Sequence, residues 1–90
     1  MTPLTAAFVA AGVPEVFAPG VAAMLERSKA LFTAQPDRDA PRAWRMCIPI
    51  MLEPFGVPID FEGLFDALER LGFMTAAVRE RIRQSFVNAS

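Results

Sequence analysis

Apolar side chains recur at three- and four-residue spacing between Asp39 and Gly56. This spacing places them on one face of an α-helix, and the face is the most hydrophobic of the chain. We therefore expect this helix to be the hub of the core. Its inward residues are Trp44, Cys47, Ile48, Met51, Leu52 and Phe55.

Prolines and a possible cap set the limits of this helix. Asp39 is placed to cap its start, with Pro41 near the first turn, and Pro54 and Gly56 are expected to stop it. Pro49 lies inside, where it removes the hydrogen bond to the carbonyl of Arg45 and crowds that turn. We expect either a kink near residues 45 to 49 or two short helices.

Two helices are predicted before this one. In the first, Thr2 is the expected N-cap, Pro3 stands at the first helical position and Gly12 stands where a helix ends. Pro19 is expected to start the second, whose outward residues include Glu26, Arg27 and Lys29. Its inward stripe is predicted to be Val21, Met24, Leu25, Leu31 and Phe32.

Two more helices are predicted after it. Asp60 is placed to cap a helix from Phe61 to Leu71, and Gly72 stops it. Thr75 is placed to cap a last helix, from Ala76 to about Val87. Its inward residues are predicted to be Val78, Ile82 and Phe86.

No segment shows the alternating pattern of a β-strand, and no repeat is visible, so the predicted class is all-α. The eight Phe residues are spread from position 8 to position 86, which indicates one continuous core. We expect a single helical domain over residues 1–90, a compact bundle of four to five short helices with a helix-turn-helix-like hairpin at its C-terminal end.

The chain carries more apolar surface than a small core readily hides. The residues AVILMFWYC make up 53% of it, against about 45–50% in typical domains even with glycine included. A 90-residue chain buries only about 60% of its unfolded surface. We therefore expect contact with another protein, with a homo-oligomer as one form of it. The alternative is a monomer that exposes scattered apolar residues.

Charge is nearly balanced overall but uneven along the C-terminal half. The net charge is −1, so a strongly basic nucleic-acid footprint is missing. Residues 53–69 carry five acids and no base, whereas residues 70–90 carry four arginines and one acid. These arginines either contact a partner or balance the neighbouring acids. The row Glu62, Asp66 and Glu69 indicates an acidic face, with Asp66 and Arg70 as an i,i+4 pair, rather than a metal site.

The sequence contains few of the residue types that commonly act in catalysis. The chain has no His and no Tyr, a single Lys and no glycine-rich phosphate loop. Its one cysteine, Cys47, lies in an apolar run and is expected to be a buried, unreactive thiol that forms no disulfide within the chain. We predict no enzyme, cofactor, metal or small-molecule substrate. No basic signal-peptide start and no membrane-spanning run is visible, so a cytoplasmic protein is expected.

The C-terminal hairpin is the most specific functional signal. Leu71-Gly72-Phe73 resembles the Leu-Gly-Val turn of bacterial repressors, and Ala76-Ala77-Val78-Arg79 resembles the start of a recognition helix in GntR-like and PaaX-like winged-helix regulators. The resemblance covers about 20 residues. It implies that Leu68, Leu71, Val78 and Ile82 pack the motif. It also implies that the residues facing the DNA major groove are Thr75, Ala76, Arg79, Glu80 and Arg83.

Two functions follow from these features. The first is a small non-catalytic protein-interaction module, such as an inhibitor, an adaptor or a minor subunit, that acts through an apolar surface and the charged hairpin. The alternative is a helix-turn-helix DNA-binding regulator. Both use the same candidate contact residues: Arg70, Thr75, Ala76, Arg79, Glu80 and Arg83.

Overall fold

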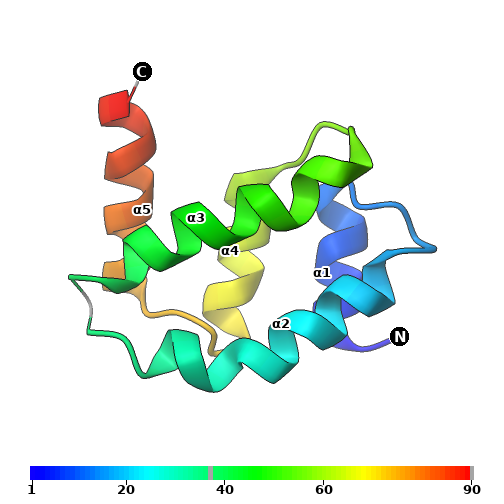
Figure 1. Ribbon diagram of the computed structural model, residues 1–90, viewed down its shortest axis with the longest axis horizontal. Coiled ribbons are helices and arrows are strands. Elements are labelled where there is room, and N and C mark those ends of the chain that lie inside the picture. The colour runs from blue at the N-terminus through cyan, green and yellow to red at the C-terminus, as the bar shows by residue number, and fades with distance from the viewer. Residues whose placement is uncertain (37, 90) are drawn as a thin grey trace.

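The structure is a computed structural model that describes residues 1–36 and 38–89, with side chains described up to residue 84. Within these ranges the chain forms five α-helices and one short 3-10 helix, and no strand (Figure 1). The all-α prediction is confirmed. The elements are α1 Pro3–Ala11, α2 Ala18–Thr33, α3 Ala40–Leu52, η1 Glu53–Phe55, α4 Phe61–Arg70 and α5 Ala76–Ala89.

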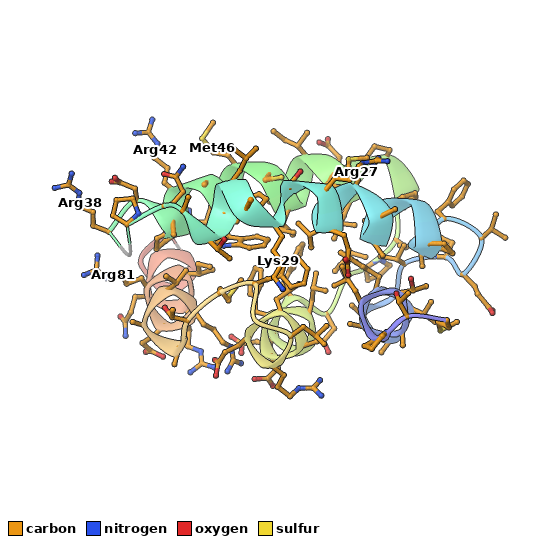
Figure 2. All side chains as sticks on the ribbon, turned by 90° about the horizontal axis from the view of Figure 1, so that it is seen from below. Arg27, Lys29, Arg38, Arg42, Met46 and Arg81 are labelled. Atoms are coloured by element: carbon orange, nitrogen blue, oxygen red, sulfur yellow. The ribbon has the colours of Figure 1, made fainter. Side chains whose placement is uncertain are left out.

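The helices are arranged in two layers. Helices α2 and α3 lie side by side in one layer, and α1, α4 and α5 form the other, with α4 in the middle (Figures 1 and 2). The three helices of the second layer run across the α2–α3 pair and are seen end-on in Figure 2. The shortest dimension of the molecule, 19 Å between Cα atoms, fits a stack two helices deep.

Local signals set most helix ends where the sequence predicts them. The hydroxyl of Thr2 accepts a hydrogen bond from the Thr5 amide, and the carboxylate of Asp60 accepts one from the Gly63 amide, each at 3.1 Å. Gly12 and Gly72 have φ angles of +115° and +84°, in the left-handed region that closes a helix. These capping predictions are confirmed.

The segment before α4 passes close to the end of α1. The amide of Asp60 donates a 2.8 Å hydrogen bond to the carbonyl of Ala11. A Cβ atom at position 12 would lie only 2.6 Å from the carbonyl oxygen of Pro58. Glycine at position 12 therefore serves two needs, the left-handed backbone and the close approach of the chain.

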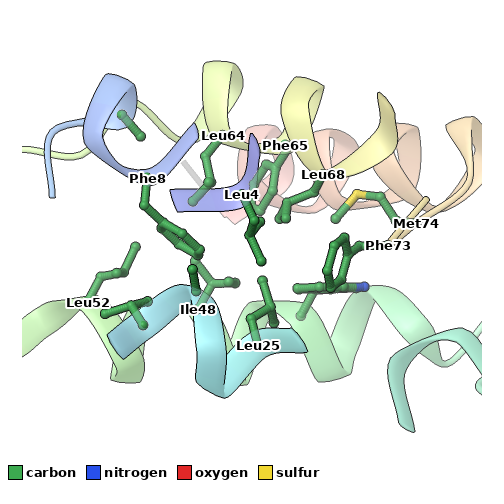
Figure 3. Packing of buried hydrophobic residues seen from close by; sticks show 14 of the residues in the cluster. Leu4, Phe8, Leu25, Ile48, Leu52, Leu64, Phe65, Leu68, Phe73 and Met74 are labelled. Carbon is green, nitrogen blue, oxygen red and sulfur yellow. The ribbon is translucent and has the colours of Figure 1, made fainter. Parts of the chain in front are cut away.

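The core lies between the two layers (Figure 3). Helices α1 and α4 contribute Leu4, Phe8, Leu64 and Leu68, and these face Leu25, Ile48 and Leu52 from the other layer. At the end of the layers nearest α5, the ring of Phe32 stacks on the fully buried Trp44 with centroids 4.0 Å apart. The predicted role of the third helix as core hub agrees with this burial.

The predicted inward stripe of α2 is partly wrong. Val21 and Leu25 are buried and Phe32 is half-buried, but Met24 and Leu31 are exposed. Because α2 rests on neighbours along a narrow face centred on Leu25, Met24 falls about 100° away from that face around the helix axis. The helix also begins at Ala18, one residue before Pro19.

One alternative for Pro49 and the cap predicted at Asp39 need correction. The helix continues through Pro49 to Leu52, so the alternative of two short helices is wrong. Only the last turn follows the proline, and the buried Ile48 and Leu52 on either side hold that turn against the core. Asp39 occupies the cap position but makes no capping hydrogen bond, because its backbone is already helical and its carboxylate lies 3.6 Å from Arg38 Nε.

The last helix starts as predicted. The Thr75 hydroxyl accepts a 3.1 Å hydrogen bond from the Val78 amide, and Val78 and Ile82 are buried against α3 and α4. The prediction that Phe86 points inward lies outside the described side chains.

Candidate interaction surfaces

The turn between α4 and α5 is closed by backbone hydrogen bonds. The amide of Gly72 donates to the carbonyl of Glu69 at 3.1 Å, and the amide of Phe73 donates to the carbonyl of Leu68 at 2.9 Å. These two hydrogen bonds, together with the left-handed conformation of Gly72 just after the end of α4, form a Schellman motif. Phe73 and Leu68 both belong to the buried core, so the turn is fixed by the core as well as by its backbone.

The acidic row of α4 faces the basic side of α5. The Arg79 guanidinium lies 2.6 Å from a carboxylate oxygen of Asp66, 3.2 Å from one of Glu62 and 3.8 Å from one of Glu69. Only 18% of the Arg79 side chain is exposed. Arg79 is therefore held by three carboxylates of its own chain.

Arg83 extends this cluster by one helical turn. Its guanidinium donates two hydrogen bonds to the carboxylate of Glu62, and its Nη1 lies 3.3 Å from Glu80. The hydrogen bond from Arg83 holds the pKa of Glu62 below its usual range, with the positive charges of Arg83 and Arg79 acting in the same direction. The same pairing raises the pKa of Arg83.

The predicted contact residues Thr75, Ala76, Arg79, Glu80 and Arg83 lie on one side of α5 or at its start, whereas Arg70 lies on α4. Arg79 and Arg83 point towards α4, and Glu80 binds Arg83 and Gln84. Thr75 caps α5, while Ala76 is exposed at its first turn.

Arg70 is exposed on α4, and the expected pair with Asp66 is absent because Asp66 binds Arg79 instead. Among the described residues Arg70 has no ion pair. It is therefore separate from the cluster formed by Arg79 and Arg83.

A second surface is found on the side of α2 and α3 that points away from the other layer. We call it the outer face and define it by Met24, Arg27, Leu31, Arg42, Met46 and Ile50, all exposed. Arg42 and Met46 project from α3 away from the second layer in Figure 2, whereas Lys29 points between the layers towards the ring of Phe73. In the sequence this surface is indicated by Arg42, Met46 and Ile50. Their i, i+4, i+8 spacing places them on one face of α3, away from the face that carries its buried residues.

A pocket of about 250 Å³ lies where the ends of α2 and α3 meet the α4–α5 turn. Its walls include the aromatic rings of Phe32, Trp44 and Phe73, and Thr33, Gln35 and Thr75 contribute polar atoms. The Lys29 ammonium lies 4.8 Å from the Phe73 ring centroid. The volume is below that of most small-molecule sites, which are about 300–1,000 Å³.

Cys47, the single cysteine, is half-buried on α3 rather than fully buried as predicted. Burial raises the pKa of its thiol. The group is therefore mainly protonated at neutral pH, which is the less reactive form.

Comparison with known proteins gives no relative. No protein-family model, curated protein or solved structure matches the chain. In the part of the chain that the structure describes, no helix has the length and apolar character needed to cross a membrane.

Proposed function

We propose that this chain is a small non-catalytic protein-interaction module, an inhibitor, an adaptor or a minor subunit, and that its contact surface is the outer face. The observation that supports this most is the exposure of four large apolar side chains on that face. The exposed fractions are 48% for Met24, 71% for Leu31, 58% for Met46 and 67% for Ile50. Burying such a side chain completely from full exposure is worth about 1.5–3 kcal/mol, so covering the exposed part of each of these four is worth roughly half of that.

DNA binding is the alternative function. The closed turn between α4 and α5 is in its favour, but Arg79 and Arg83, the two arginines assigned to base contacts, are bound to carboxylates of α4. To reach DNA they would have to leave those partners and bring the acids Glu62 and Asp66 near the phosphates. We therefore place this function second.

Site-specific photo-cross-linking tests the interaction function. A photoreactive amino acid placed at Ile50 should give a discrete cross-linked species in cells of the natural host, or a dimer of the purified chain. The same group at Ala77, exposed on α5, is the matched control and should give none. Leu31→Glu should remove the cross-link at Ile50, because it places a charge beside the apolar row. The proposal would be contradicted if the photoreactive group at Ile50 gave no cross-link and the chain were monomeric by light scattering.

Fluorescence anisotropy with random duplex DNA tests the alternative. DNA binding should weaken steeply between low and moderate salt and should be lost in Arg79→Ala/Arg83→Ala. An interaction module should show no such salt-dependent binding.

A further inference from the structure

We propose that the outer face binds the outer face of a second copy of this chain, with the two α3 helices antiparallel around a two-fold axis at Met46. This inference rests on the interaction function proposed above and names its partner. In the dimer, Arg42 of each copy pairs with Glu53 of the other, and the exposed apolar side chains of the two faces cover each other.

The observation that carries this inference is a pair of opposite charges at the two ends of the α3 row. Arg42 and Glu53 are both exposed, and among the described residues neither has an ion pair. Their positions are about 16 Å apart along the helix axis at 1.5 Å per residue, so they cannot pair within one chain. A second α3 that runs antiparallel supplies a carboxylate for each arginine, twice over.

The positions of these residues around α3 fit such a pairing. Met46 is two residues from both Trp44 and Ile48, which are fully buried, so it points directly away from the core. Arg42 precedes Met46 by four residues and Glu53 follows it by seven, which places both within about 40° of Met46 and on the same edge of the row. A two-fold axis at Met46 keeps that edge and reverses the helix. Arg42 then lies about 4.5 Å along the axis from Glu53 of the other copy, within reach of two long side chains.

The other charges near the row do not oppose this contact. Asp39 stands at the start of the row, but its carboxylate lies 3.6 Å from Nε of Arg38 in the same chain. Arg27 lines the hollow beside Glu26 on the flank of α2 next to α1. The dimer therefore joins Arg42 and Glu53 as the two unpaired charges of the α3 row, and their signs are complementary across the axis.

Helix α2 fits the same axis. It runs antiparallel to α3, as two ring stacks at opposite ends of the pair show (Figure 1): Phe17 on Phe55 and Phe32 on Trp44. Counting 1.5 Å per residue from these stacks places Met46 level with about residue 28 of α2. Met24 and Leu31 lie at nearly equal distances on either side of that level. The axis therefore places Met24 of one copy opposite Leu31 of the other, which covers two exposed apolar side chains.

The size of the outer face predicts a weak dimer. The face is about 20 Å long, the length of the 13 residues of α3, and about 20 Å wide, the width of two helices. Two such faces amount to about 800 Å² as flat surfaces, at the small end of specific interfaces. We therefore expect a dissociation constant on the order of 100 µM, with the monomer predominant at 1 µM.

Exchange of the two charges tests the pairing. Sedimentation velocity of the whole chain from about 10 µM to 1 mM should show a mass that rises from one chain towards two. Arg42→Glu and Glu53→Arg should each weaken the dimer by about tenfold or more, and the double variant Arg42→Glu/Glu53→Arg should restore it. Arg81→Glu, exposed on α5, changes the net charge by the same amount as Arg42→Glu and should have no effect.

The exchanged residues are also compatible with the folded helix, because a glutamate at the start of α3 and an arginine at its end both favour the helix dipole. Circular dichroism checks that each variant is folded. Failure of the double variant to restore the dimer, or an equal loss in Arg81→Glu, would overturn the proposed arrangement.

A disulfide at the axis provides a second, independent test. Facing Cα atoms of two helices packed 8–10 Å apart lie about 3.5–5.5 Å from each other, which overlaps the range of a disulfide. In a Cys47→Ala background, Met46→Cys should therefore give a covalent dimer under mild oxidation. Ala77→Cys in the same background, exposed on α5, is the matched control and should stay monomeric. Equal yields from the two variants would contradict an axis at Met46.

Two further outcomes separate this inference from the function on which it rests. If the chain stays monomeric at 1 mM but the photoreactive group at Ile50 captures a different protein, the interaction function stands and the second copy is wrong. If the monomeric chain binds phosphatidylcholine vesicles and Leu31→Glu abolishes that binding, the outer face belongs to lipid and the dimer is again overturned.

Discussion

The guanidinium group of Arg83 donates two hydrogen bonds to the carboxylate of Glu62, from Nε to Oε1 at 3.3 Å and from Nη2 to Oε2 at 3.0 Å. This bidentate contact joins α5 to α4 on the surface of the molecule. The same carboxylate also accepts a hydrogen bond from Arg79 at 3.2 Å. Glu62 is thus the shared anchor for two arginines that the sequence suggested for DNA.

The stability of the hairpin should depend on pH through Glu62. Since pairing with Arg83 lowers the pKa of Glu62 below its ordinary value of 4.5, the stability it contributes is complete above that value. It is lost as the pH falls through the lower pKa of the folded state. Urea unfolding measured between pH 7 and pH 3 should show that the free energy of unfolding falls less with decreasing pH for Glu62→Gln than for the parent chain. Parallel curves for the two proteins would count against this assignment.

Arg79→Gln should lower the free energy of unfolding by about 1 kcal/mol, because three carboxylates lose their nearly buried partner. Urea midpoints at low salt provide the measurement. The difference from the parent should shrink in 1 M salt, where exposed charges are screened within about 3 Å. Arg70→Gln is the matched control and should change stability by less than about 0.5 kcal/mol, because Arg70 is exposed.

Leu25→Ala and Leu31→Ala make the same chemical change at buried and exposed positions of one helix. Leu25 is fully buried, so its truncation should cost about 2–5 kcal/mol, whereas truncation of the exposed Leu31 should stay within about 0.5 kcal/mol. The single tryptophan, Trp44, is buried and reports unfolding by a red shift of its fluorescence. Similar losses for the two variants would mean that Leu31 is covered, for example by a second copy.

Gly12→Ala and Gly20→Ala should change stability in opposite directions. At position 12 the backbone is left-handed and a Cβ atom would meet the Pro58 carbonyl, so a loss of more than about 1 kcal/mol is expected. At position 20, inside α2, nothing lies within 4 Å of the added Cβ. Alanine there should raise the free energy of unfolding by about 0.5 kcal/mol. Thermal unfolding followed by circular dichroism distinguishes the two; a stabilised Gly12→Ala would contradict the close approach at Pro58.

The helices and most of their ends could be predicted because their causes are local. Thr2, Asp60 and Thr75 bond to amides three residues ahead, and Gly12 and Gly72 end helices through their own backbone angles. Such signals act within a few residues, so they are visible in the sequence. The charge asymmetry of the last two helices was also visible, although whether those charges pair with each other or with a partner was not.

What could not be predicted depends on packing between helices. Met24 and Leu31 look like core residues by spacing, but α2 has neighbours on one narrow side only. Pro49 looks like a break, but the buried residues around it keep α3 continuous. The direction of Arg79 depends on where α4 lies relative to α5, which no local pattern specifies. The position of the outer face could not be predicted for the same reason, since it depends on which sides of α2 and α3 no other described helix covers.

The hydrogen bond between Asp60 and Ala11 ties the beginning of the chain to a segment made much later during synthesis. While the ribosome is still producing residues before α4, the first helix has α2 beside it but lacks its other neighbour. A nascent or prematurely terminated chain ending near residue 56 therefore leaves the α4-facing side of α1 uncovered. Such fragments should aggregate and be degraded by proteases more readily than a chain that includes the fourth helix.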